Sequence, residues 1–502
     1  MQSGFTALDA VVLAAYFVGT LWLGLKLGRK QKDARDYFVG DRRLPWWAVS
    51  FSVVATETSA LTFISIPALA YVGNLGFLQI AFGYFIGRVA VSALLLPRYY
   101  QGELVTAYAL LEQRFGVGTR RFASVTFMAT RALAASVRVF ATSIPLALLL
   151  GPILPAHWLA PTAILVLSAA SVVYTYFGGT RAVVWTDVVQ MTTYLLGGVA
   201  ALVLLGMHVD GGWTAIFSRA GDVHKLKLIN MSFELNDPHT LWAGLLGGGF
   251  LSMASHGADQ LIVQRLLSAR DLRDARRALL TDAVVVILQF ALFLFVGVGL
   301  WAYYNGQTFA QSDRIFPTFI VTVMPPGLRG LIVAALTAAA MGTISNSLTA
   351  LAAATTHDLW LPLSKRRAED PETLRAGRRF TLIWAVVLIG AALLYREQGT
   401  PVVEIALAIA SFTYGPLLGG FFLGILWKRA RQFDAIAGMG VSLVVMTFVV
   451  FAARLSAWFP SLASTLSPLA RISWPWYVLI GTAVTMIVGM STSFFHEASS
   501  KQ

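Results

Sequence analysis

The stretch from Trp47 to Tyr71 is long enough to cross a bilayer, yet its middle, Ala55-Thr56-Glu57-Thr58-Ser59, carries a carboxylate and three hydroxyls. A charge at mid-membrane costs about 2.5 kcal/mol or more, so such a residue usually serves a function. A helix broken here would free carbonyls and hydroxyls to coordinate an ion or a solute. The alternative is a polar helix face turned toward the protein core, whose hydroxyls bond to carbonyls one turn away. We favour the broken helix, in which Glu57 pairs with a basic group or holds a proton.

A second group of oxygen-bearing side chains falls within three helical turns near residue 340. Close packing of helices through small residues explains the alanines and Gly342 of this stretch, as is common in membranes. It does not explain the polar side chains between them, which are Thr337, Thr343, Ser345, Asn346 and Ser347. Because hard cations prefer oxygen ligands, we interpret this stretch as part of an ion site.

Three charged or titratable side chains lie inside other apolar stretches. Arg131 and Arg138 are seven residues apart and therefore share a helix face. Arg131 is near enough to the cytoplasmic end to reach water, whereas Arg138 is too deep to do so easily. An arginine fork suits a carboxylate ligand, but a buried pair with Glu57 or another acid would also explain Arg138. His256, the only histidine well inside a span, is either a ligand or a hydrogen-bonded structural residue.

The composition indicates what kind of protein must position these residues. Of 502 residues, 57% are hydrophobic and 13% are charged, against about 25% charged in soluble proteins. This composition predicts an all-α polytopic membrane protein. The chain has no cysteine, which excludes disulfides and thiolate metal sites. The first apolar run, at 6–27, lacks the features of a cleaved signal peptide and is expected to remain as a membrane helix.

We expect about thirteen membrane-spanning segments and no separate soluble domain. The segment at 315–359 is too long for one crossing, and Met324-Pro325-Pro326-Gly327 should divide it and start a helix near Leu328. The predicted segments are 6–27, 46–72, 75–97, 121–150, 156–178, 183–207, 240–264, 278–303, 315–359, 380–396, 402–427, 433–453 and 473–494.

The basic residues predict the orientation of these segments. With the N-terminus outside and the C-terminus in the cytoplasm, most of the 38 Lys and Arg fall in cytoplasmic loops, as the positive-inside rule requires. The net charge of +13 therefore reflects topology, and nucleic-acid binding is excluded. Arg88 is expected to cap contacts between spans near the cytoplasm.

Several runs, in this order and spacing, resemble the sodium/solute symporter family, and above all its sialic acid and monocarboxylate/iodide/vitamin branches. They are Asp36-Tyr37-Phe38-Val39-Gly40-Asp41-Arg42-Arg43-Leu44-Pro45-Trp46-Trp47, Thr106-Ala107-Tyr108-Ala109-Leu110-Leu111-Glu112-Gln113-Arg114-Phe115-Gly116, Ala182-Val183-Val184-Trp185-Thr186-Asp187-Val188-Val189-Gln190, Asp259-Gln260 with Gln264-Arg265, and Ala339-Ala340-Met341-Gly342-Thr343-Ile344-Ser345-Asn346-Ser347.

The resemblance implies a LeuT-type fold in one membrane domain over residues 1–502. Two inverted repeats of five helices would occupy 46–207 and 240–427, with a leading helix at 6–27 and two C-terminal helices at 433–494. The chain would then work as a multi-pass protein of a bacterial inner membrane, with the bilayer, a small solute and sodium as its partners, and it would function as a monomer.

The resemblance also implies two sodium sites. The first would use the carbonyls of Ala55, Thr58 and Ala339 and the hydroxyl of Thr343; Gly342 stands where the family often has a serine ligand. A possible second site would use Asp187 with Ser345 and Asn346. For Asp187 the alternative is an acid favoured by the dipole at a helix N-terminus, worth about 0.3–1 kcal/mol.

In this fold the solute lies at the midplane, between the broken helices and their neighbours. Arg138 stands about where the sialic acid branch has an arginine that binds the substrate carboxylate. Asp259 and Gln260 are interpreted as gate or structural residues. The candidate solute ligands are Ser59, Thr62, Gln79, Arg138, Ser255, His256, Ser411 and Phe412, together with Thr413.

These observations favour a sodium-coupled symporter that imports a small organic anion, such as a sugar acid or another carboxylate, by alternating access. The alternatives are coupling to protons, a neutral solute, and a membrane sensor related to transporters. No GxxxxGK[ST] loop is present, which argues against ATP-driven transport. A membrane enzyme would need a nucleophile with a base or a metal cluster, and Ser255, His256 and Asp259 are the only candidates. We therefore expect no enzymatic activity.

Overall fold

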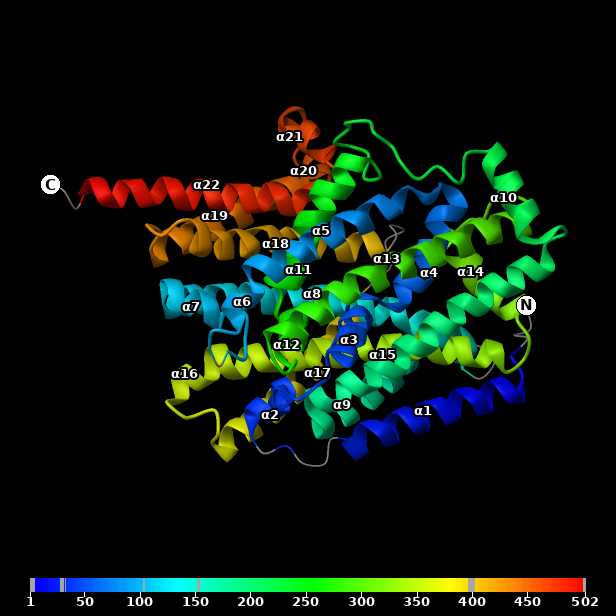
Figure 1. The fold of residues 1–502 in the computed structure, drawn as a ribbon, viewed down its shortest axis with the longest axis horizontal. Helices are drawn as coiled ribbons and strands as arrows, with labels where there is room; N and C mark the ends of the chain where they lie inside the picture. Colours follow the sequence, from blue (N-terminus) through cyan, green and yellow to red (C-terminus); the bar gives the residue numbers. More distant parts are fainter. Residues whose placement is uncertain are drawn as a thin grey trace.

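The computed structural model describes residues 5–27, 31, 33–102, 104–150, 154–395 and 402–499, and within them the regular structure is helical. Most of the long helices run side by side along one direction, with the start of α1 and the end of α22 at opposite ends of the molecule (Figure 1). The α-helices are α1 (Ala7–Leu27), α2 (Ala34–Val39), α3 (Trp46–Glu57), α4 (Ala60–Val72), α5 (Leu78–Leu94), α6 (Leu96–Tyr99), α7 (Ala109–Phe115), α8 (Val117–Leu150), α9 (Ala156–His208), α10 (Gly212–Asp222), α11 (Gly249–Gly257), α12 (Gln260–Leu267), α13 (Leu272–Tyr303), α14 (Ile315–Val323), α15 (Leu328–Ala354), α16 (Leu361–Ser364), α17 (Pro371–Leu394), α18 (Val402–Leu426), α19 (Gln432–Val450), α20 (Ala452–Trp458), α21 (Ala463–Ala470) and α22 (Trp476–Ser499).

The predicted break in the first polar helix is confirmed. Helix α3 ends at Glu57, the backbone is extended at Thr58 (φ −83°, ψ 131°), and α4 continues at an angle of 63°. The amide of Ser59 donates to the hydroxyl of Thr62 (3.3 Å) and caps the start of α4. The carbonyl of Ala55 therefore loses the partner that a continuous helix would supply, since that partner is the same amide.

A second broken helix lies opposite. A π-helical segment, Ala243–Gly248, runs into α11, which ends at Gly257. Asp259 is extended (φ −91°, ψ 122°), and its carboxylate accepts a hydrogen bond of 2.8 Å from the amide of Leu261 at the start of α12. The break at Asp259 leaves backbone groups of α11 without helical partners, and the side chain of Asp259 caps the start of α12.

Two further interruptions match the sequence. The predicted segments 156–178 and 183–207 are the two arms of α9, which bends at Gly179. This glycine has φ +56°, and a Cβ there would lie 2.7 Å from the carbonyl oxygen of Tyr37, so only glycine fits. The predicted start of a helix at Leu328 is also confirmed, since extended Met324 and Gly327 (φ +86°) separate α14 from α15.

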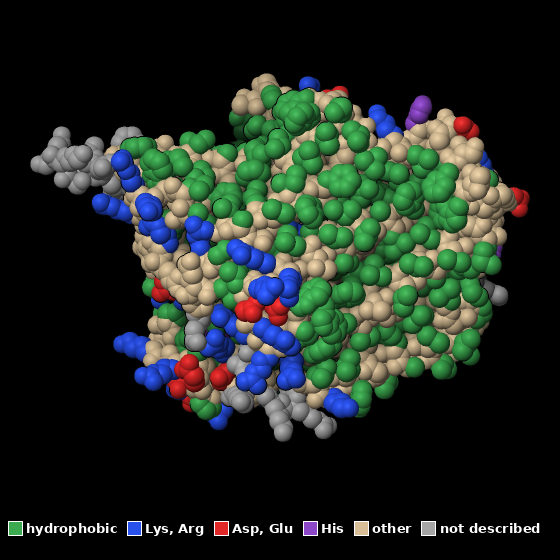
Figure 2. All heavy atoms as spheres, in the orientation of Figure 1, with side chains coloured by type: hydrophobic (Ala, Val, Ile, Leu, Met, Phe, Trp, Pro, Cys, Tyr) green, Lys and Arg blue, Asp and Glu red, His purple; other side chains and the backbone are tan. Residues whose placement is uncertain are grey.

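The described residues contain nine helices long and apolar enough to cross a membrane, or ten when α3 and α4 are taken together. The expected total of thirteen segments stays a prediction. The surface agrees with a membrane protein, because hydrophobic side chains cover most of the visible face (Figure 2). Lys and Arg gather at the end of the molecule where α7 and α16 lie (Figures 1 and 2).

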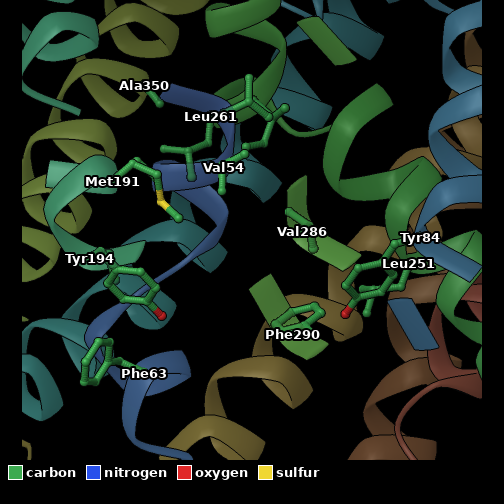
Figure 3. Packing of buried hydrophobic residues seen from close by; sticks show 14 of the residues in the cluster. Val54, Phe63, Tyr84, Met191, Tyr194, Leu251, Leu261, Val286, Phe290 and Ala350 are labelled. Carbon is green, nitrogen blue, oxygen red and sulfur yellow. The ribbon is translucent and has the colours of Figure 1, made fainter. Parts of the chain in front are cut away.

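A cluster of aromatic rings holds α4 in place. The ring of Phe63 lies 4.9 Å from Tyr194 of α9, 4.8 Å from Phe293 of α13 and 4.9 Å from Phe316 of α14, measured between centroids. Phe63 and Tyr194 lie next to each other in Figure 3, apart from the group formed by Tyr84, Leu251 and Phe290. The half of the broken helix beyond Ser59 is therefore packed on three other elements.

Candidate ion and solute sites

A cavity lies where the two helix breaks face each other. Helices α5, α8, α13 and α18 complete its wall, and Tyr84, Leu251 and Phe290, which lie together in Figure 3, are part of its apolar lining. Its polar lining consists of Thr56, Glu57, Ser59, Thr62, Arg131, Arg138, Ser255, His256 and Tyr414.

Five of the nine residues predicted to contact the solute line this cavity: Ser59, Thr62, Arg138, Ser255 and His256. Gln79 does not. Its Nε2 donates to the carbonyl of His239 (2.8 Å) and its Oε1 accepts from the amide of Asn230 (3.0 Å), so its amide group binds the loop before the second broken helix.

On α18 the lining residues are Ala410 and Tyr414, one turn apart. Ser411 and Phe412, which the sequence analysis proposed, are not among the residues that line the cavity, and Thr413 is not either. The ring of Phe412 instead lies 6.3 Å from that of Phe451 on α19. The cavity thus borders the predicted turn of α18 through Ala410 and Tyr414, and solute contacts of Ser411 and Phe412 stay a prediction.

Arg138 projects into the cavity from α8 and, among the described residues, has no hydrogen-bond or ion-pair partner. The buried pair with Glu57 that was considered as an alternative does not form, because Glu57 pairs with Arg88. An unpaired guanidinium in a membrane-embedded cavity is costly and favours an anion beside it.

Arg88, which the sequence analysis expected to cap contacts between spans, binds two acids, one of which, Glu57, lines the cavity. Its guanidinium is fully buried, pairs with Glu57 of α3 and lies 2.9 Å from Asp282 of α13. His256 of α11 completes the group, with Nε2 3.5 Å from Asp282 and 3.7 Å from Glu57. We call Glu57, Arg88, His256 and Asp282 the acidic cluster. It joins α3, α5, α11 and α13.

Arg131, expected to reach toward the cytoplasm, is instead buried and pairs with Asp259 at the second break. Its guanidinium also donates to the hydroxyl of Tyr414 (3.0 Å). The charge of Arg131 is thereby compensated within the protein, in contrast to that of Arg138. This pair supports the interpretation of Asp259 as a structural or gate residue.

The predicted first sodium site lies between the first break and α15. The hydroxyl of Thr58 bonds to the side chain of Gln289 (3.0 Å), which leaves its carbonyl as the candidate ligand beside that of Ala55. On α15 the hydroxyl of Thr343 donates to the carbonyl of Ala339 (3.0 Å), so these two oxygens lie together. The oxygen donors suit a hard cation.

Gly342, the fifth residue predicted for this site, lies against α9. A Cβ there would be 2.8 Å from Oε1 of Gln190 and 3.5 Å from Oδ1 of Asp187. A serine at this position would therefore require the side chain of Gln190 to shift. Gly342 leaves space for the side chain of Gln190 next to the second candidate sodium site. It supplies no side-chain ligand to the first candidate sodium site.

Asp187 of the predicted second site is fully buried, two turns beyond the bend at Gly179. It is therefore not the acid of a first helical turn that was considered as an alternative. Its Oδ2 accepts from the hydroxyl of Ser52 (2.6 Å), whereas Oδ1 has no partner among the described residues. Ser345 donates to the carbonyl of Gly342 (3.1 Å), which places it on the adjoining turn of α15.

Asn346, the other predicted member, is fully engaged. Its Nδ2 donates to Thr56 (2.9 Å) and its Oδ1 accepts from Arg265 of α12. It therefore links α15 to both broken helices. Asp187 Oδ1 and both polar atoms of Gln190 remain buried without partners in the described part of the chain, which fits a site for a cation.

Several residues of these sites were missed by the sequence analysis. Asp282 is an acid within an apolar segment and could have been noticed for that reason alone. Gln190 lies one turn after Asp187 within a run already recognised. Ser52 lies one turn before Thr56. The aromatic lining, including Tyr84 and Phe290, has no signal beyond ordinary hydrophobicity.

The loop before the second broken helix packs against the end of α4 and against Phe77 beside the cavity. Nζ of Lys225 donates to the carbonyls of Tyr71 (2.6 Å) and Gly73 (3.1 Å) at the end of α4, and burial lowers the pKa of this amine. The ring of His239 lies 6.0 Å from that of Phe77, which also lines the cavity. Burial lowers the pKa of His239, and nearby Asp237 opposes this shift.

A helical membrane protein with two broken helices facing one polar cavity has the architecture of a secondary active transporter. The chain matches the family model "Sodium:solute symporter family" over residues 37–442. It therefore belongs to the sodium:solute symporter family, is a sodium-coupled transporter with a LeuT-type fold, and is not an enzyme.

Individual relatives agree with this assignment. The chain is 30% identical to the sodium/sialic acid symporter NanT of Aliivibrio fischeri, over 97% of this chain and 93% of that protein. It is 29% identical to a sodium-dependent multivitamin transporter of Oryctolagus cuniculus, over 98% of this chain and 78% of that protein.

Solved structures show the same fold. The substrate-bound, outward-open structure of a Na⁺-coupled sialic acid symporter superposes with a TM-score of 0.84 at 28% identity, covering 98% of both chains. Mhp1, a nucleobase-cation-symport-1 family transporter, matches with a TM-score of 0.54 at 12% identity, over 92% of this chain and 95% of that chain. The second likeness concerns the fold alone.

Proposed function

We propose that this protein imports a small organic carboxylate together with sodium by alternating access. The observation that carries the proposal is Arg138, a guanidinium that has no partner among the described residues and lines the cavity between the two helix breaks. Its planar fork provides two parallel hydrogen bonds to a carboxylate. The sialic acid symporters among the relatives support an anionic solute of the sugar-acid kind.

The start of α4 supports the same conclusion. Its capping residue Ser59 and the first-turn residue Thr62 both line the cavity. The N-terminus of a helix carries partial positive charge, and half-helices of transporters point this end at anionic groups. The solute carboxylate would thus lie between Arg138 on α8 and the start of α4, with Ser255 and His256 on the facing wall.

We assign the coupling sodium to the carbonyls of Ala55, Thr58 and Ala339 and the hydroxyl of Thr343. A possible second sodium would be held by Asp187 and Ser345, with Gln190 in place of Asn346, whose amide is already engaged. Each inward sodium adds about 2.3 kcal/mol per 100 mV to its concentration term. A sodium ion that binds both α3 and α15 favours the conformation in which these helices are close. The affinity for the solute increases if the solute binds that conformation more tightly.

The remaining expectations are part of the same proposal. The two halves at 46–207 and 240–427 would each begin with one of the two broken helices. The basic end of the molecule would face the cytoplasm of a bacterial cell, and α1 would begin outside (Figures 1 and 2). The protein would work as a monomer in the inner membrane.

A thermal-shift screen of the purified protein tests the proposal. Sialic acid, gluconate, lactate and glucose are added with and without sodium, to the protein and to Arg138→Ala. We expect at least one carboxylate to stabilise the protein only with sodium, and the variant to lose this effect. The exposed Arg471→Ala serves as a matched control. Stabilisation by glucose alone, or carboxylate stabilisation that survives in Arg138→Ala, would contradict the proposal.

A further inference from the structure

The acidic cluster places a carboxylate oxygen at the cavity wall, away from Arg138. All contacts of Glu57 with Arg88 and His256 run to its Oε2 atom. Oε1 has no partner among the described residues, and the side chain is 20% exposed although it lies in the membrane-embedded part of the protein. The exposed part of the Glu57 side chain faces the cavity, because Glu57 is one of the residues that line it.

The charges around the cavity do not cancel locally. Arg131 and Asp259 neutralise each other at the second break. Among the described residues, Glu57 and Asp282 share the cation Arg88, and its contact with Glu57 leaves Oε1 of that carboxylate unpaired. On α8, Arg138 adds a positive charge without a partner. The cavity therefore has a cationic pole and an acceptor pole on different helices.

A carboxylate oxygen accepts hydrogen bonds and donates none. A purely apolar tail against Glu57 would leave Oε1 desolvated and unpaired, which is unfavourable. We infer that the solute is bifunctional: its carboxylate binds Arg138, and a hydrogen-bond donor at its other end, a hydroxyl or an ammonium group, binds Oε1 of Glu57. This inference rests on the proposed function and adds the second pole of the site.

The inference also assigns a positioning role to Arg88. Arg88 donates a hydrogen bond to Oε2 of Glu57 and thereby fixes the direction in which Oε1 points. Asp282 stabilises Arg88 from α13 without lining the cavity. Glu57 is therefore the residue that selects the solute, whereas Asp282 acts only through Arg88.

Two matched series of ligands test this inference by thermal shift in sodium. The three-carbon series is propionate, lactate and β-alanine, and the six-carbon series is hexanoate, gluconate and 6-aminohexanoate. In at least one series, we expect the hydroxylated or the amino member to bind at least about tenfold more tightly than the unsubstituted acid, which is the effect of one charge-assisted hydrogen bond. Comparing the two donors identifies the group that Glu57 accepts.

In Glu57→Gln, Arg88 should hold the amide oxygen and leave the NH2 group, a donor, facing the cavity, so the preference should disappear. Binding of the unsubstituted acid should persist, because Arg138 is unchanged. Asp282→Asn is the matched control for disturbance of Arg88 and should retain the preference. Sodium-dependent stabilisation of each variant shows that it is folded.

Three results would overturn the inference. One is equal binding of substituted and unsubstituted acids to the unmodified protein. Another is an unchanged preference in folded Glu57→Gln. The third is the absence of any ligand shift in a protein that sodium itself stabilises. Loss of all carboxylate binding in Arg138→Ala, with the preference present before substitution, supports both poles. Carboxylate binding that persists in Arg138→Ala contradicts the proposed function, but a preference abolished by Glu57→Gln would still support the acceptor pole.

Discussion

Nδ2 of Asn346 donates a hydrogen bond of 2.9 Å to the hydroxyl of Thr56, in the last turn of α3 before the break at Thr58. The same asparagine accepts from Arg265 of α12, beyond the second break. The side chain of Asn346 thereby connects α15 to both broken helices through hydrogen bonds. A cation bound beside Asn346 would therefore affect the positions of both broken helices that border the solute cavity.

Thr343→Ala should weaken sodium activation. The substitution removes one hydroxyl ligand from the proposed first site but leaves the carbonyl of Ala339 in place. We expect the sodium concentration for half-maximal thermal stabilisation to rise by about tenfold, equivalent to about 1.4 kcal/mol. Thr322→Ala, at an exposed threonine that also bonds to its own helix, is a matched control. Unchanged sodium activation would exclude Thr343 as a ligand.

Asp187→Asn should separate the two proposed sodium sites. The change retains the size of the side chain and its acceptor for Ser52, but removes the charge beside Gln190 and Gly342. If this site holds a sodium, the steepness of sodium activation should decrease while the protein stays folded. Activation curves of equal steepness and midpoint in both proteins would refute a sodium at Asp187.

Much of this architecture could be predicted from residues in the chain. The break at Thr58 follows from a charged, hydroxyl-rich run in an apolar segment, and the start of α15 at Leu328 follows from consecutive prolines. The faces of the helices could not be predicted as well. Gln79 bonds to His239 and Phe412 packs against Phe451, because the rotation of a helix about its axis depends on packing with neighbours distant in sequence.

The ion-pair partners of the buried arginines also could not be predicted from the local sequence. Arg88, Arg131 and Arg138 are similar in the sequence, since each is one arginine in an apolar helix. Only their partners distinguish them, and these lie on other helices: Asp282 for Arg88 and Asp259 for Arg131. The absence of such a partner for Arg138 is a property of the fold and not of the local sequence.

Gly83→Ala should destabilise the contact between α5 and the second broken helix. A Cβ at this position would lie 2.0 Å from the carbonyl oxygen of Gly244 and 2.9 Å from the amide of Gly249. We expect a loss of about 1–3 kcal/mol, because the backbones must separate. The measurement is the Tm of the purified protein. In Gly390→Ala, where nothing lies within 4 Å, the Tm should stay unchanged or rise. Equal Tm values for Gly83→Ala and the unmodified protein would contradict this packing.

His239, in the loop before the second broken helix, should make the stability of the protein sensitive to acid. Because burial lowers the pKa of His239 from 6.5, the unfolded chain binds this proton more readily than the folded one. Stability from this group is complete above about pH 6.5 and decreases as the pH falls below that value. The decrease in Tm between pH 7.5 and pH 5.5 should be smaller in His239→Gln than in the unmodified protein. The exposed His157→Gln should show the full decrease, and an identical decrease in all three proteins would exclude His239 as the cause.

Uptake into proteoliposomes tests the combination of sodium coupling and carboxylate binding most directly. The carboxylate that gives the largest sodium-dependent thermal shift is supplied outside, with sodium outside only, on both sides, or absent. Uptake should follow the inward sodium gradient, increase with an inside-negative potential, and fall at least tenfold in Arg138→Ala. Accumulation that ignores the sodium gradient, or that persists in Arg138→Ala, would contradict a sodium-driven carboxylate symporter.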